Sequence, residues 1–230
     1  MPVTLPDTAA TETLVIELTN KVRAREHLGG VRSETALAAA ARAYARYLAK
    51  AHAFSHTADG KQATERAAAA GYASCQMAEN LAMTENSDGF ATAALAQETL
   101  EGWLNSPGHR ANLLAPNVTD IGVAVARIDG QYPKFVIVQM LGRPMTLATN
   151  FQVSNATKAT VTYTLSGASH KIEPGMGIRH TVCEPKALEF KSAGLSALTG
   201  RYTAEGGKVY TVTSKGGKLA VEVKTADSIR

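Results

Sequence analysis

Two adjacent runs of the sequence are apolar on both faces of any strand that they form. The first run, "IGVAVARI", covers residues 121–128, and the second, "KFVIVQML", covers residues 134–141. Asp129 and Gly130 between them favour a turn, so the pair predicts an antiparallel hairpin. Strands that are apolar on both faces must be covered on both faces. We therefore predict an α+β fold, a three-layer α-β-α sandwich.

Four segments ahead of the hairpin carry the apolar period of helices. The first stops before Gly29, the second follows Ser33 as a predicted N-cap, the third stops at Gly71, and the fourth must end ahead of Pro107. The predicted apolar positions are Leu14, Leu18 and Val22 in the first, Leu37, Ala41, Tyr44 and Leu48 in the second, an Ala-rich stretch over about 62–70 in the third, and Ala93, Ala96, Leu100 and Trp103 in the fourth.

The pattern changes from about Thr146 onward. "TKATVTYTLSG" alternates Val161, Tyr163 and Leu165 with polar residues, which is the period of a half-buried strand. Two Gly-Gly pairs farther along introduce two more short strands, as hairpin turns do. We expect an N-terminal extension, a helical domain and a small β-sandwich-like domain with frayed last residues; their ranges are 1–13, 14–145 and 146–230.

The formal net charge of +4 is unevenly distributed along the chain. Residues 1–145 carry 13 Lys and Arg against 14 Asp and Glu, whereas residues 146–230 carry 11 against 6. The sequence has no run of like charges and no basic helix with interleaved aromatic residues, so we expect no nucleic-acid partner. A weak attraction of the second part to anionic envelope material stays open.

Export signals leave two interpretations open. No apolar stretch approaches the roughly 20 residues that span a bilayer, so no transmembrane segment is expected. The start lacks the features of a signal peptide, which fits either a cytoplasmic protein or a secreted, periplasmic or cell-surface protein whose signal is not part of this chain.

The two cysteines also leave two interpretations open. Cys75 and Cys183 form either one long-range bridge or two buried thiols.

Side chains suited to a ligand site occur in four separate segments. "FSHTADG" contains His56, "MAENLA" contains Glu79 and Asn80, "GWLNSPGHRANLL" contains His109, and "VIVQMLG" contains Gln139. Imidazole and carboxylate groups suit Zn²⁺, and they equally suit an acid–base pair. A histidine just after a Pro-Gly turn can also be a capping group, so residue types alone leave the question open.

The order of several motifs narrows these alternatives. "LTNKVRAREHL", "FSHTADG", "ERAAAAGY", "AENLA", "WLNSPGHRANLLAPNVTDIGVAVA" and "VQMLG" follow one another in this chain. This order resembles the CAP superfamily, also called SCP-like, which includes cysteine-rich secretory proteins, antigen 5 and plant pathogenesis-related proteins. The form of the motifs is similar to the bacterial variety, and the resemblance covers about residues 14–143. It implies an α-β-α sandwich and a secreted, periplasmic or surface location.

The resemblance also implies a central cavity lined by two histidines and two acidic residues, which bind divalent metal in some members. His56, Glu79 and His109 match three of these positions and are the expected ligands of Zn²⁺ or another divalent cation. The fourth position departs from the pattern, because the residue three after Trp103 is Ser106.

Two carboxylates lie about one turn earlier than the missing fourth ligand. Glu98 and Glu101 are therefore its candidate replacements, and we place Glu98 and Gln139 with the three matched residues in the predicted ligand cavity. With only three matched ligands, the site would leave an open position for water or hold metal weakly.

Three functional hypotheses follow. The favoured one is an exported binding protein whose cavity holds a metal or a small, lipid-like ligand. The second is a metal-dependent or histidine-assisted hydrolase, although the chain lacks HExxH and GxSxG motifs. The third is a non-catalytic scaffold whose basic β-domain binds envelope or protein partners. The sequence identifies neither the ligand nor the oligomeric state.

Overall fold

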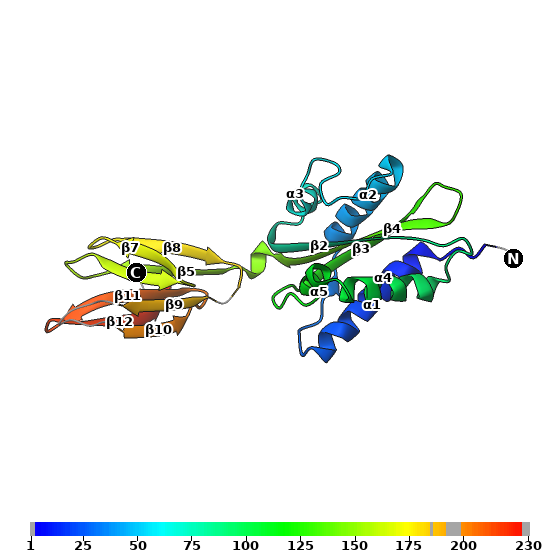
Figure 1. Ribbon diagram of the computed structural model, residues 1–230. Coiled ribbons are helices and arrows are strands. Elements are labelled where there is room, and N and C mark those ends of the chain that lie inside the picture. The colour runs from blue at the N-terminus through cyan, green and yellow to red at the C-terminus, as the bar shows by residue number, and fades with distance from the viewer. Residues whose placement is uncertain (1–2, 185, 192–198, 227–230) are drawn as a thin grey trace. The chain divides into compact units, whose positions relative to one another are not determined.

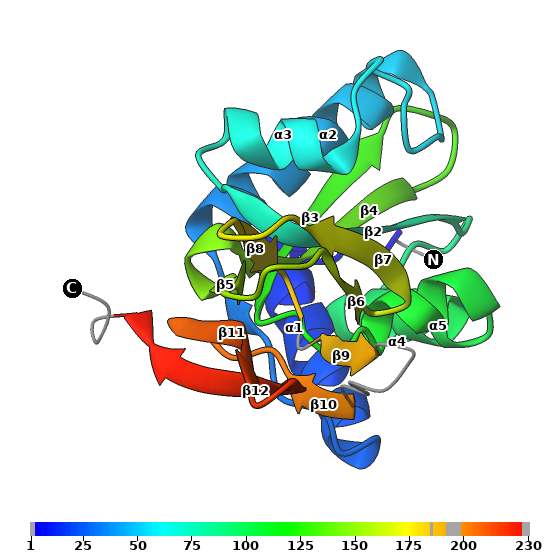
Figure 2. The same ribbon diagram turned by 90° about the vertical axis from the view of Figure 1, so that its left-hand side faces the viewer.

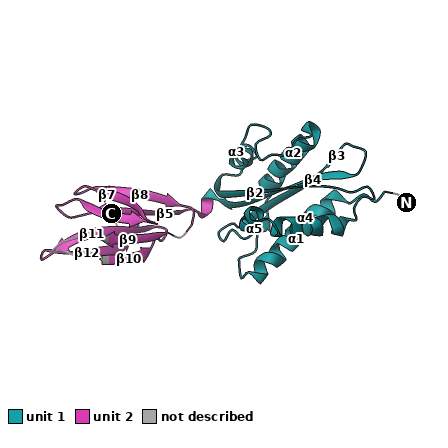
Figure 3. Ribbon diagram, in the orientation of Figure 1, with its two compact units in different colours: residues 1–145 teal, residues 146–230 magenta. Residues whose placement is uncertain are grey.

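The chain divides into two compact units, Met1–Met145 and Thr146–Arg230. Figure 3 shows the two units in different colours. The computed structural model describes residues 3–184, 186–191 and 199–226. The predicted fraying of the last four residues falls on 227–230, outside the described residues.

The first unit is built from five helices and one four-stranded sheet, counted over its described residues 3–145. The strand order is β1-β3-β4-β2, and both β3 and β2 run antiparallel to β4. The β3–β4 pair is the predicted hairpin. The helices are α1 (Thr8–Arg25), α2 (Thr35–Ala51), α3 (Ala63–Ala69), α4 (Thr92–Leu104) and α5 (Pro107–Leu113). The strands are β1 (Arg32–Ser33), β2 (Ser74–Glu85), β3 (Asp120–Ile128) and β4 (Lys134–Pro144).

Helices cover both faces of this sheet, as the two-faced apolar strands predicted. In Figure 1, α2 and α3 lie on one side of the sheet and α1, α4 and α5 on the other. Figure 2 shows α2 and α3 next to each other above the strands. Each face has its own core: Val123 and Phe135 pack with α1, α4 and α5, whereas Ala124 and Val136 pack with α2. The α-β-α prediction is confirmed.

Close packing of α2 on the sheet depends on Gly122 in β3. A Cβ atom at this position would lie 2.2 Å from the backbone carbon of Leu37, so any side chain would push the helix away. The four predicted apolar positions of α2 are all buried.

Several local predictions need correction. The N-cap of α2 is Glu34, whose carboxylate accepts the N–H of Leu37, and Ser33 belongs to β1 instead. On α1 the buried apolar residues are Val15 and Val22, because the helix is rotated relative to the predicted stripe. Pro107 begins α5 at a position where its missing N–H costs nothing, so the Pro-Gly pair starts a helix rather than forming a separate turn.

The second unit consists of two four-stranded sheets within the described residues after Thr146, ordered β10-β9-β6-β7 and β12-β11-β5-β8. Residues from both sheets share one core, including Phe151, Tyr163 and Tyr210. A short 3-10 turn (Met145–Leu147) precedes it. The strands are β5 (Thr149–Asn155), β6 (Val161–Leu165), β7 (Ala168–Ile172), β8 (Gly177–Val182), β9 (Ala187–Lys191), β10 (Thr199–Thr203), β11 (Lys208–Lys215) and β12 (Lys218–Thr225).

The β11–β12 hairpin follows the Gly-Gly prediction. Gly216 and Gly217 both have positive φ, +58° and +78°, which is the backbone conformation of a two-residue hairpin turn. No helix of the described residues is both long and apolar enough to cross a bilayer.

Two histidines of the second unit meet a buried tyrosine. The rings of His170 and His180 are 5.0 Å apart, and the hydroxyl of Tyr163 lies 2.5 Å from Nε2 of His180. Burial raises the pKa of Tyr163 to about 12, so its hydroxyl is protonated and donates to a neutral imidazole. Burial, and then the nearby His170, lowers the pKa of His180.

We expect the second unit to lose stability in acid. The unfolded state takes up a proton at His180 below about pH 6.5, whereas the folded state resists protonation until a lower pH. The free energy of unfolding therefore falls as pH drops below 6.5. Hydrogen exchange of the β-unit amides in the full chain, measured at several pH values, checks this. His180→Gln should flatten the slope, and an unchanged slope would contradict this assignment.

Candidate functional site

The candidate site lies at the free edge of β2. Among the described residues this strand pairs with β4 alone, so alternate backbone carbonyls face outward and need partners. The side-chain amide of Asn112 donates to the carbonyl of Glu79 at 3.1 Å, and the indole Nε1 of Trp103 donates to the carbonyl of Leu81 at 3.0 Å. These two contacts attach α5 and α4 to the strand edge and place His109 of α5 beside it.

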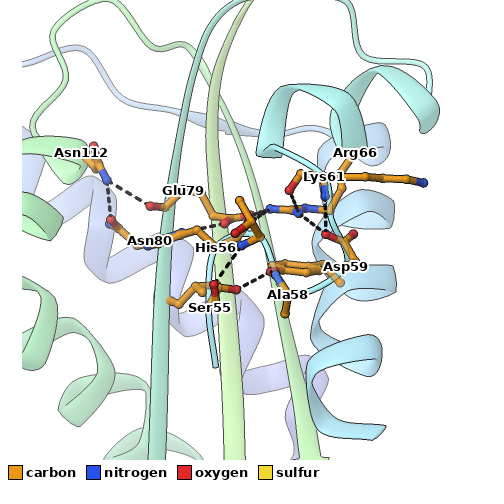
Figure 4. A network of polar contacts seen from close by, with 12 residues as sticks. Ser55, His56, Ala58, Asp59, Lys61, Arg66, Glu79, Asn80 and Asn112 are labelled. Carbon is orange, nitrogen blue, oxygen red and sulfur yellow. Dashed lines mark hydrogen bonds and ion pairs between the residues drawn. The ribbon is translucent and has the colours of Figure 1, made fainter. Parts of the chain in front are cut away.

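Glu79 is the centre of a network on the α2–α3 face of the sheet (Figure 4). Its Oε1 lies 2.8 Å from Nδ1 of His56, and its Oε2 accepts a hydrogen bond from Arg66 at 2.7 Å. The side chain of Glu79 is only 3% exposed, whereas that of His56 is 54% exposed. The carboxylate therefore orients an imidazole whose ring is accessible to solvent.

Arg66 of α3 supplies the positive charge that this buried carboxylate requires. Its guanidinium also bonds Asp59 at 2.9 Å and donates to the backbone carbonyls of His56 and Lys61. The guanidinium carbon lies 3.5 Å from the centre of the Tyr44 ring. Arg66 thus holds the loop between α2 and α3, residues 52–62, which contains His56, against the sheet. Sequence reasoning missed this role, although the residue stands in the quoted "ERAAAAGY" motif.

Asn80 and Gln139 form a separate network on the opposite face, because successive residues of a strand point to opposite sides. The amide of Asn80 donates to Oε1 of Gln139 at 3.0 Å and to the carbonyl of His109 at 3.2 Å. The amide of Gln139 donates to Thr19 of α1 at 3.0 Å. Gln139 is fully buried by these contacts. Contrary to the prediction, Gln139 does not line the hollow beside α4.

A hollow of about 320 Å³ lies along the β2 edge beside α4. We call it the Trp103 groove. Apolar and polar side chains both line it. The apolar ones are Phe54, Leu81, Ala82, Met83 and Trp103, and the polar ones are Thr84, Glu98, Thr99 and His109. Glu98 accepts a hydrogen bond from the hydroxyl of Thr84. Glu98 and His109 therefore share one hollow, whereas His56 and Glu79 contact each other and do not line it.

The surroundings of His109 favour its neutral form. Burial, and then the positive charge that His56 carries when protonated, lowers the pKa of His109. A neutral imidazole offers one N–H donor and one acceptor to a ligand.

The expected metal ligands His56, Glu79 and His109 do not form an assembled metal site in this arrangement. Both oxygens of Glu79 are engaged, one by His56 and the other by the Arg66 cation. The described residues contain no group of three or more His, Cys, Asp or Glu side chains placed to hold an ion. Ser106, at the position of the missing fourth ligand, is the N-cap of α5. Metal binding by His56, Glu79 and His109 stays a prediction.

Comparisons with known proteins agree with the fold. The model of the cysteine-rich secretory protein (CAP) family matches residues 16–141. An outer surface protein from Borrelia burgdorferi is 20% identical, with a TM-score of 0.52 over 60% of this chain and 96% of that one. No curated protein matches the chain.

Two further solved structures are similar at lower TM-scores. One is an extracellular protein containing an SCP domain from Bacillus anthracis, 24% identical, with a TM-score of 0.48 over 59% of this chain and 41% of that one. The other is a cysteine-rich secretory protein from Staphylococcus aureus, 19% identical, with a TM-score of 0.40 over 60% of this chain and 40% of that one.

Proposed function

Because the chain belongs to the cysteine-rich secretory protein (CAP) family, we propose that it is an exported binding protein whose ligand lies in the Trp103 groove. The exported location is supported by the family description and by the cysteines, both of which are disulfide-bonded. Disulfides persist in oxidising compartments outside the cytosol.

One observation carries the ligand assignment: apolar side chains stay exposed where they line this groove. Phe54 is 48% exposed and Met83 is 41% exposed. Large apolar side chains gathered around a hollow are typical of a binding site. His109 and Glu98 supply a hydrogen-bond donor and acceptors at the same place. The groove therefore suits a small amphipathic ligand with an acyl-like chain and a polar end.

Fluorescence of Trp103 tests this proposal directly, because it is the only tryptophan of the chain. We expect a dibrominated fatty acid to quench the emission in a saturable way, since bromine quenches on contact. Free bromide ion is the control, and it should quench little because Trp103 is only 1% exposed.

Replacement of Gly102 by leucine is expected to abolish this quenching without harming the fold. Gly102 lines the groove on α4, and a Cβ atom there meets nothing within 4 Å, so the new side chain has room to fill the groove. Removing a glycine from a helix should also raise the free energy of unfolding by about 0.5–1 kcal/mol. Thermal unfolding of the variant measures that gain.

Ala94→Leu is the matched control, because Ala94 is an exposed residue of the same helix that does not line the groove. Ala94→Leu should keep the quenching of wild type. If wild type shows no saturable quenching, or if Gly102→Leu still binds, the groove is not the ligand site. The scaffold interpretation, with the basic β-domain as the binding part, would then be favoured.

A histidine-assisted hydrolase is the second candidate, and the His56–Glu79 contact favours it. A carboxylate that accepts the Nδ1 proton of an exposed imidazole leaves Nε2 as a proton acceptor, as in general-base catalysis. Under this candidate the protein hydrolyses p-nitrophenyl acetate, and His56→Gln lowers kcat/KM by about 100-fold or more.

Exposed His52, outside the network, provides the control variant His52→Gln, which should keep full activity. A rate equal to that of buffer would exclude the hydrolase. Activity lost on addition of a chelator and restored by Zn²⁺ would instead support the metal-dependent form, with His56, Glu79 and His109 as ligands.

A further inference from the structure

Helix α2 carries a row of positive side chains beside the outer edge of β3, and Glu12 neutralises the first of them. Arg42, Arg46 and Lys50 recur at every fourth residue of α2 and so share one face of the helix. β1 pairs with β3 only at Asp120 and Ile121, so the rest of that strand edge is open to side chains.

Glu12 of α1 shows how this edge accommodates a negative charge. Its Oε1 accepts the backbone N–H of Val125 at 3.0 Å, and its Oε2 pairs with Arg42 at 3.2 Å. A carboxylate is thus held between an outward strand amide and the first cation of the row. A second guanidinium and a second outward strand amide follow in the same arrangement. Arg46 lies one helical turn after Arg42, and Arg127 lies two strand residues after Val125.

Helix α1 has no carboxylate beside Arg46 and Arg127 that corresponds to Glu12. The residue one turn before Glu12 is Thr8, which lines a hollow of about 460 Å³ together with Arg46, Lys50, His52 and Arg127. The only acidic residue that lines it is Asp129. Within the described part of the chain, the side chains of Arg46, Lys50 and Arg127 form no ion pair or hydrogen bond.

We propose that this hollow binds a phosphate group, held by Arg46, Lys50 and Arg127 in the way that Arg42 and Val125 hold Glu12. Three cations against one carboxylate leave an excess of two positive charges, which matches a phosphate monoester better than a single carboxylate. Guanidinium groups also bind phosphate oxygens in a bidentate manner. The hollow is larger than one phosphate, so the group belongs to a larger polar molecule such as a polyol phosphate.

The test is a titration of the ¹⁵N-labelled full chain with inorganic phosphate and, separately, with glycerol 3-phosphate. We expect saturable shifts of the Arg127 and Asp129 amides, with tighter binding of the ester. Acetate should bind more weakly than either. Arg46→Gln and Arg127→Gln should each weaken binding by about tenfold, because each removes a charge-assisted hydrogen bond. Arg25→Gln, at an exposed arginine of α1, should have no effect.

A second variant places a carboxylate of the protein itself in the proposed phosphate site. Thr8→Glu should abolish phosphate binding while keeping or raising the melting temperature, since an acidic residue at the first position of a helix is favourable. Thr13→Glu adds the same charge at an exposed position of α1 and should bind phosphate as wild type does. The proposal is overturned if wild type shows no saturable shift, or if Arg46→Gln, Arg127→Gln and Thr8→Glu all bind as tightly as wild type.

Discussion

Replacement of Arg66 by methionine is expected to lower the free energy of unfolding by about 3–5 kcal/mol, because it leaves the buried carboxylate of Glu79 without its guanidinium partner and with only the imidazole of His56 in contact. The two side chains of this pair are 6% and 3% exposed, so water cannot replace the lost cation. Urea unfolding followed by the fluorescence of Trp103 measures the effect, since this tryptophan reports on the same unit.

Two further variants separate the pair from the rest of the network. Arg66→Met combined with Glu79→Gln should be more stable than Arg66→Met alone, because position 79 no longer carries a buried charge that lacks its guanidinium partner. Arg110→Met is the matched control: Arg110 pairs with Glu26 on the surface, where both side chains are about half exposed, and its loss should cost no more than about 1 kcal/mol. Equal losses for Arg66→Met and Arg110→Met would contradict the role given to Arg66.

Reduction of the disulfide is expected to lower the free energy of unfolding by up to about 5 kcal/mol. Both cysteines of the chain are disulfide-bonded, and we expect one bridge from Cys75 to Cys183 within each molecule. Such a bridge closes a loop of about 100 residues, and in the chain-entropy model it acts by restricting the unfolded state. Urea unfolding with and without a reductant measures the difference.

Thiol titration and electrophoresis check the pairing itself. The denatured, unreduced protein should contain no free thiol and should migrate as a monomer. The Cys75→Ser/Cys183→Ser double variant should match the stability of the reduced protein. Two free thiols would show that no bridge forms, and a dimer that dissociates on reduction would show that the cysteines join two chains.

The edge strand β2 illustrates where the sequence pattern was insufficient. Its middle carries Glu79 and Asn80 in succession, so it has neither the two-sided apolar pattern of β3 nor a clear alternation. Pairing with β4 over residues 74–85 makes it a strand, and that pairing is a tertiary contact. The same pairing sends Glu79 and Asn80 to opposite faces, which is why the predicted site residues separate into two networks.

Only the order of the motifs assigned the predicted site residues to a common site. His56, Glu79 and His109 stood out by residue type, but neither spacing nor period indicates that Arg66 pairs with Glu79. That pair joins a helix to a strand, and it exists because α3 packs against β2. The hollow shared by Glu98 and His109 likewise depends on how α4 and α5 attach to the outward carbonyls of β2.

The sequence by itself determined the layered architecture, because the period of the apolar residues indicates which face of each helix and strand must be buried. Two-faced apolar strands require helices on both sides, and Leu37, Ala41, Tyr44 and Leu48 require that α2 turn one face inward. Only the tertiary structure decided the chemistry of the site, since charge pairing acts over a few ångströms between segments far apart in the chain. The contact of Arg66 with Glu79, which occupies one oxygen of an expected metal ligand, is a property of that packing.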